Sequence, residues 1–147
     1  IPKTPKTWNG NEKMTNEELV YWSLCSVQGF ANTRVNDCFF DEQLPVNENG
    51  EFLVVVSRKE DRPRNARLGC GYGWLPIADD GDGVNDSDIG VFQIRNLLAS
   101  PDFKYSIQNI KQIGTEKEVM GEYFPRSFYT SKEAFEAFFP CYPEMKN

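Results

Sequence analysis

The number and spacing of the cysteines constrain the fold of this chain more than any other sequence feature. Cysteines occur at positions 25, 38, 70 and 141, and none of them belongs to a CxxC pair of the kind found in zinc sites or redox dithiols. Two disulfide bonds are the favoured interpretation, and four buried free thiols are the alternative. We expect Cys25 to pair with Cys38, because these two flank a hairpin, and Cys70 to pair with Cys141.

Composition places the chain among folded domains of an oxidising compartment. Of its 147 residues, 39% are hydrophobic and 14% are aromatic, which is more than a disordered chain carries. We expect residues 1–14 to form an extended arm and residues 15–147 to form a single β-sandwich domain. The cysteines, and a start at Ile1-Pro2-Lys3 without an apolar signal segment, predict a processed protein that is extracellular or periplasmic.

Charge and the absence of histidine exclude several classes of function. The formal net charge is -6, and the chain has no histidine. An acidic chain argues against nucleic acid as a partner, and no apolar run is long enough for membrane insertion. Ser-His-Asp and Cys-His catalysis and histidine-based metal sites are excluded. The sequence therefore favours a protein that is not an enzyme, although a pair of carboxylates among the 22 acidic residues remains a formal alternative.

Four hydrophobic runs predict short β-strands. Each run is rich in β-branched or aromatic residues and is bounded by turn formers. The runs cover residues 19–27, 51–57, 71–77 and 90–97. If the last two pair as a hairpin, the acidic segment between them is an exposed tip.

Helical signals lie mostly toward the C-terminus. A Pro at the first helical position and apolar spacing predict a helix over residues 100–113. A second short helix is predicted from Thr130 or Ser131 to Phe139, and residues 15–18 have capping-box spacing for a helical turn. The predicted fold is mainly β, a β-sandwich or jelly roll of short strands with two or three short peripheral helices.

One acidic segment is a candidate calcium site. Residues 78–88, ADDGDGVNDSD, alternate short acidic side chains with glycine. Ca²⁺ takes about six to eight oxygen ligands, and such an alternation supplies them within a sharply turning loop. The candidate ligands are Asp80, Asp82, Asp86 and Asp88. The alternative is a solvated loop, because exposed turns are commonly acidic and rich in glycine.

The same segment resembles the calcium loops of thrombospondin type 3 repeats and of dockerin-like and EF-hand-like motifs. In this resemblance the ligand positions fall on Asp80, Asp82 and Asp86, and the turn glycine falls on Gly83. Ala78 stands where the first Asp is expected. Ile89 stands at the closing acidic position, one residue after Asp88. The resemblance is therefore confined to the middle of the segment.

A larger part of the chain, residues 19–140, resembles the C-terminal jelly-roll domain of uncharacterised bacterial secreted or periplasmic proteins. The stretches that carry the resemblance are Tyr21-Trp22-Ser23-Leu24, Phe52-Leu53-Val54-Val55-Val56, Trp74-Leu75-Pro76 and Phe92-Gln93-Ile94-Arg95. These motifs are aromatic and structural, so the resemblance implies a fold and carries over no catalytic residue.

Two functions follow from these patterns. The first is a non-catalytic β-sandwich binding or assembly module, stapled by disulfides and with calcium as a candidate ion. Its arm, residues 1–14, would reach protein partners or a second copy at an exposed sheet edge. The alternative is a protein that binds a small molecule or carbohydrate, or a lyase-like enzyme. Its ligand cleft would contain Trp22, Trp74 and Arg95.

Overall fold

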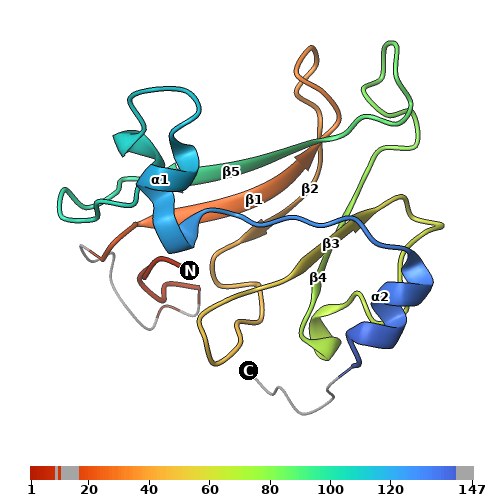
Figure 1. Ribbon diagram of the computed structural model, residues 1–147, viewed down its shortest axis with the longest axis horizontal. Coiled ribbons are helices and arrows are strands. Elements are labelled where there is room, and N and C mark those ends of the chain that lie inside the picture. Colours follow the sequence, from red (N-terminus) through yellow and green to blue (C-terminus); the bar gives the residue numbers. More distant parts are fainter. Residues whose placement is uncertain (9, 11–16, 142–147) are drawn as a thin grey trace. The chain divides into compact units, whose positions relative to one another are not determined.

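Five short strands in two sheets form the framework of the chain (Figure 1). The computed structural model describes residues 1–8, 10 and 17–141. The strands are β1 (Tyr21–Val27), β2 (Val35–Phe40), β3 (Val54–Ser57), β4 (Gly73–Pro76) and β5 (Val91–Leu97). The helices are α1 (Glu116–Met120) and α2 (Lys132–Phe138), with 3-10 turns η1 (Leu68–Cys70), η2 (Ile107–Asn109) and η3 (Gly121–Tyr123). The chain is thus mainly β, with its short helices toward the C-terminus.

The two sheets differ in strand direction. In the three-stranded sheet β1 lies between β2 and β5, and its antiparallel pairing with β2 sets Cys25 opposite Cys38. In the second sheet β3 and β4 are parallel, with Val54 opposite Gly73. The hairpin considered for residues 71–77 and 90–97 is wrong, because β4 pairs with β3 and β5 pairs with β1.

Helix prediction succeeded at α2 and failed after β5. The hydroxyl of Ser131 accepts a hydrogen bond from the backbone N–H of Ala134 at 3.1 Å and caps α2. Within residues 100–113, which the structure describes throughout, the only helical element is the 3-10 turn η2. There the Asn109 side chain donates to the carbonyls of Phe103 and Lys104 at 3.2 and 3.0 Å, which occupies acceptors that a helix would use. The turn predicted at residues 15–18 falls partly outside the described residues.

The chain divides into two compact units, each built from two segments. Unit 1 comprises Ile1–Trp22 and Arg95–Phe128, and unit 2 comprises Ser23–Ile94 and Tyr129–Asn147. The buried apolar side chains of unit 1 include Leu19, Trp22, Phe103 and Met120, and those of unit 2 include Val27, Leu44, Leu75 and Phe135. Each unit therefore has an apolar core of its own.

Both predicted disulfides are confirmed, and both belong to unit 2. Cys25–Cys38 joins the paired strands β1 and β2, with a sequence separation of 13. Cys70–Cys141 joins η1 to the residue that follows α2, with a separation of 71. Among the described helices, none has the length and apolar character that crossing a membrane requires.

Candidate functional site

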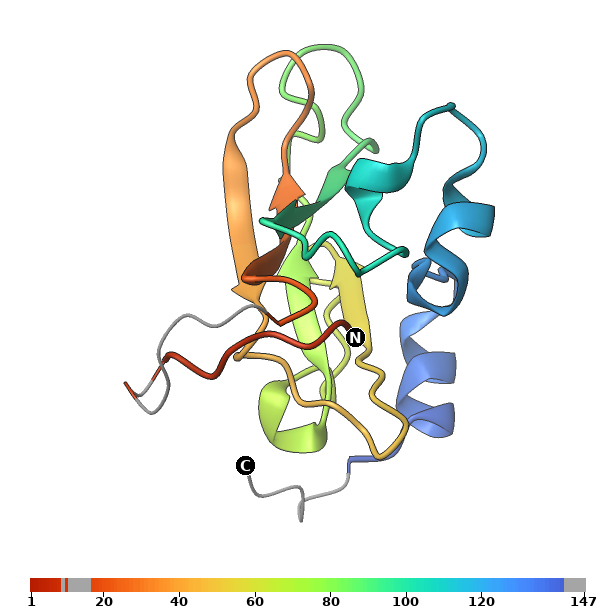
Figure 2. The ribbon, with the colours of Figure 1, turned by 90° about the vertical axis from the view of Figure 1, so that its left-hand side faces the viewer.

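Two loops of unit 2 lie side by side beyond the ends of the strands (Figure 2). The first, residues 28–34, connects β1 to β2, and the second, residues 78–88, lies between β4 and β5. A Cβ atom at Gly29 would lie 3.1 Å from the carbonyl oxygen of Asp82, so the two backbones are in contact. Residues 28–34 and 78–88 together are named the two-loop tip.

A short chain of side-chain hydrogen bonds joins the two loops. Asn32 Nδ2 donates to Gln28 Oε1 at 2.9 Å, and Gln28 Nε2 donates to Asp80 Oδ1 at 2.6 Å. Gln28 is buried, and a Cβ atom at Gly83 would lie only 2.6 Å from its Nε2 atom. The missing side chain at Gly83 therefore leaves the space in which Gln28 bridges the loops.

The side chain of Asp82 stabilises the second loop, residues 78–88, through hydrogen bonds to its backbone. Its Oδ1 atom accepts hydrogen bonds from the backbone N–H groups of Val84, Asn85 and Asp86 at 2.8, 2.8 and 3.0 Å. The bond from Asp86, followed by those from Val84 and Asn85, lowers the pKa of Asp82 below its usual value, because amide donors stabilise the charged carboxylate. The carboxylate of Asp82 is thus engaged by the backbone of its own loop.

The other predicted calcium ligands also have partners within the chain. Asp86 Oδ1 accepts a hydrogen bond from the backbone of Asp88 at 2.9 Å, and Asp88 Oδ1 forms an ion pair with Arg58 at 2.7 Å. Within residues 1–8, 10 and 17–141, no group of three or more acidic or cysteine side chains is arranged to hold a metal ion. The calcium site stays a prediction, and its candidate ligands serve the loop as hydrogen-bond acceptors.

The two-loop tip exposes two apolar side chains that the sequence analysis did not single out. Phe30 is 80% exposed and Val84 is 65% exposed. Thr33 has a φ of 51° in the same loop as Phe30, and its N–H donates to the Gly29 carbonyl at 3.0 Å. A left-handed conformation costs a β-branched residue about 1–3 kcal/mol, so surrounding contacts must hold it. The only sequence signal for Phe30 is an aromatic residue in a turn between two paired cysteines.

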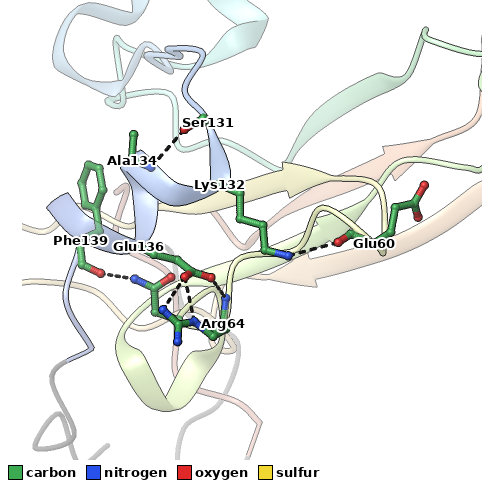
Figure 3. Close-up of polar contacts among 8 residues, drawn as sticks. Glu60, Arg64, Ser131, Lys132, Ala134, Glu136 and Phe139 are labelled. Carbon is green, nitrogen blue, oxygen red and sulfur yellow. Dashed lines mark hydrogen bonds and ion pairs between the residues drawn. The ribbon is translucent and has the colours of Figure 1, made fainter.

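A second polar cluster, named the helix clasp, fastens α2 to residues 58–67 (Figure 3). The backbone N–H and the Nε atom of Arg64 donate to the Glu136 carboxylate at 2.7 and 2.8 Å. Lys132 Nζ donates to the Glu60 carbonyl at 3.2 Å, and the Asn65 side-chain amide donates to the Phe139 carbonyl. The hydrogen bonds from Arg64 lower the pKa of Glu136.

The residues of the predicted ligand cleft have separate surroundings. Trp22 is buried in the core of unit 1. Trp74, in unit 2, has the Arg62 guanidinium 4.4 Å from its ring centre, and its Nε1 atom donates to Ser57 Oγ at 2.9 Å. Arg95 is an exposed residue of β5. Neither of the two surface hollows described for the chain is lined by Trp22, Trp74 or Arg95, so this cleft stays a prediction.

No family model, curated protein or solved structure matches this chain. The resemblances to calcium loops and to a bacterial jelly-roll domain therefore stay predictions.

Proposed function

We propose that this protein is a non-catalytic binding module of an extracellular or periplasmic compartment, and that it contacts a protein partner through the two-loop tip. The observation that carries the proposal is the exposure of Phe30 and Val84 on two loops whose backbones are held by hydrogen bonds. Loops that are ordered before binding lose little conformational freedom when a partner docks. Aromatic side chains are also frequent among the residues that dominate binding energy.

The titratable groups support binding over catalysis. The shifted pKa values of Asp82, Glu116 and Glu136 are explained by hydrogen bonds that hold loops or the helix clasp. A catalytic site instead directs such groups at one reacting position. The two disulfides support a location in an oxidising compartment.

A β-sandwich is the architecture that we propose for the two sheets of this module. The proposal is supported by the close approach of side chains from β2 and the turn after it to Gly73 of β4, within unit 2. A Cβ atom at Gly73 of β4 would lie 2.6 Å from Leu44 Cδ2 and 3.0 Å from Phe39 Cε2. Side chains from β2 and from the turn after it thus reach the second sheet, as the inner faces of a sandwich do.

Assembly through residues 1–14 is a further part of the proposal. The first residues of this arm are engaged within unit 1, because Lys3 N donates to Glu18 Oε2 at 2.8 Å and Lys3 O accepts from Leu19 N at 3.1 Å. Light scattering on a variant without residues 1–14 tests this route. A lower oligomeric state than that of the full chain supports it, and an unchanged state contradicts it.

A selection from displayed peptides, with the full chain as bait, tests binding through the tip. Phe30→Ser combined with Val84→Ser should abolish binding of the selected peptides, because it removes both apolar contacts but keeps the backbone bonds to Asp82. Phe138→Ser is the matched control, since Phe138 is 79% exposed but belongs to α2. Equal binding by the tip variant and the control, or no peptide above background, contradicts the proposal.

A further inference from the structure

Unit 1 contains a surface hollow of about 420 Å³ at a place where three chain segments meet. Lys3 comes from the N-terminus, Glu17 and Glu18 precede β1, and residues 100–105 follow β5. The backbone N–H of Ser100 donates to the Glu18 carbonyl at 2.9 Å, and the Lys3 backbone is bonded to residues 18 and 19. The volume lies within the range of about 300–1,000 Å³ that is typical of small-molecule sites.

One wall of this hollow is an aromatic ring that other rings hold in place. Tyr105 is 44% exposed, and its ring centre lies 6.1 Å from that of buried Phe103 and 5.4 Å from that of Tyr123. A Cβ atom at Gly121, whose φ is 54°, would lie 3.3 Å from the Tyr105 ring. The Tyr105 ring therefore packs against Phe103, Tyr123 and the backbone at Gly121, and part of it stays exposed to solvent.

The polar lining of the hollow carries both charge signs. The carboxylates of Glu17 and Asp102 accept hydrogen bonds only, and the ammonium groups of Lys3 and Lys104 donate only. Within the described part of the chain, the charged groups of these four side chains have no hydrogen bond or ion pair. A ligand that carries both donors and acceptors can satisfy this lining.

We propose that the hollow binds a neutral mono- or disaccharide. Each sugar hydroxyl both donates and accepts, so it can bridge the carboxylates and the ammonium groups, and the C–H face of a sugar ring can lie on Tyr105. An anion would be disfavoured by the three acidic residues of the lining, Glu17, Glu18 and Asp102, and a cation by its two lysines. A purely apolar ligand would bury these charges without partners, which is costly.

The hollow belongs to unit 1 and the two-loop tip belongs to unit 2, so the two proposals rest on different residues. The test is a titration of the ¹⁵N-labelled full chain with glucose, galactose, mannose, N-acetylglucosamine and their disaccharides, followed by backbone amide shifts. We expect saturable shifts at residues 17–19 and 100–105 with at least one sugar. Tyr105→Ala should weaken that binding about tenfold, whereas Tyr105→Phe, which keeps the ring, should retain most of it.

Two further variants distinguish a loss of sugar binding from a loss of stability caused by poorer packing. Lys104→Met removes a donor from the lining and keeps the aromatic cluster, so it should weaken sugar binding without lowering the unfolding midpoint. Tyr129→Ala, at an exposed tyrosine of unit 2, should change nothing. The amino acid glycine, which carries both charges, is titrated in the same way. The proposal is overturned if no sugar gives saturable shifts, if Tyr105→Ala binds as tightly as the parent chain, or if free glycine gives such shifts and no sugar does.

Discussion

In both the two-loop tip and the helix clasp, carboxylates hold irregular backbone through hydrogen bonds. The two regions differ in whether their aromatic side chains are buried or exposed. Beside the helix clasp, Phe135 is buried and stacks on Phe139 with 4.8 Å between ring centres, and Tyr72 meets both rings edge-on. In the tip, Phe30 stays exposed. The same kind of hydrogen bonding thus holds an element of the fold in one region and supports an exposed side chain in the other.

Removing the disulfide Cys70–Cys141, beside the helix clasp, should cost more stability than removing Cys25–Cys38. The double variant Cys70→Ser, Cys141→Ser opens a loop closed by cysteines 71 positions apart. The double variant Cys25→Ser, Cys38→Ser opens a loop closed by cysteines 13 positions apart. Loop entropy predicts losses of about 4 and about 3 kcal/mol in the free energy of unfolding. Denaturant unfolding of the unreduced proteins measures both. A larger loss for the second pair would contradict this ordering.

Phenylalanine truncation should separate the two regions most clearly. Phe135 is 3% exposed, so Phe135→Ala should lower the free energy of unfolding by about 3–5 kcal/mol. Phe30→Ala should change it by no more than about 0.5 kcal/mol, because little of this ring is buried. Parallel urea titrations provide the comparison. If Phe30→Ala is as costly as Phe135→Ala, the ring of Phe30 belongs to the fold and not to a binding surface.

Replacing Thr33, the strained residue of the tip, should have a smaller effect, and this effect should be a gain in stability. Thr33→Gly should raise the free energy of unfolding by up to about 1 kcal/mol, because glycine adopts a φ of 51° without strain. Thr33→Ala is the control, since alanine keeps most of the penalty. A clear loss of stability in Thr33→Gly would show that the threonine side chain makes a contact that outweighs the strain.

The smallest expected effect is a local dependence on pH at Asp82. Folding lowers the pKa of this carboxyl, so its contribution to stability is complete above the pKa of the unfolded chain and is lost as pH falls through the lowered folded pKa. Hydrogen exchange of the amides of residues 84–86 should therefore lose protection in that acidic window. Asp82→Asn keeps an acceptor but does not titrate, so protection that remains dependent on pH in this variant would assign the effect to another group.

Much of the strand framework could be predicted from local sequence, because runs such as residues 54–56 are β-branched and bounded by turns. The strand β2 was not predicted separately, since its sequence, VNDCFF, mixes polar and apolar residues. The parallel pairing of β3 with β4 depends on contacts between distant residues that no local pattern encodes. The false helix after β5 had the right spacing, but the Asn109 side chain competes for its carbonyls.

The acidic loop was recognised as an unusual segment, but its role could not be predicted. The sequence shows five carboxylates between residues 78 and 88. It does not show that Asp82 turns inward to three backbone amides or that Gln28, from another loop, reaches Asp80. These contacts join residues that are far apart in the chain or depend on the path of the loop.

The proposed protein contact requires the two-loop tip to be ordered before any partner binds. ¹⁵N relaxation of the free protein measures the backbone order parameters of Phe30 and Val84 directly. The hydrogen bonds of Gln28 and Asp82 predict values near those of rigid strands, about 0.85. Values below about 0.6 at both residues would rule out an ordered tip, because the exposed side chains would then lie on mobile loops.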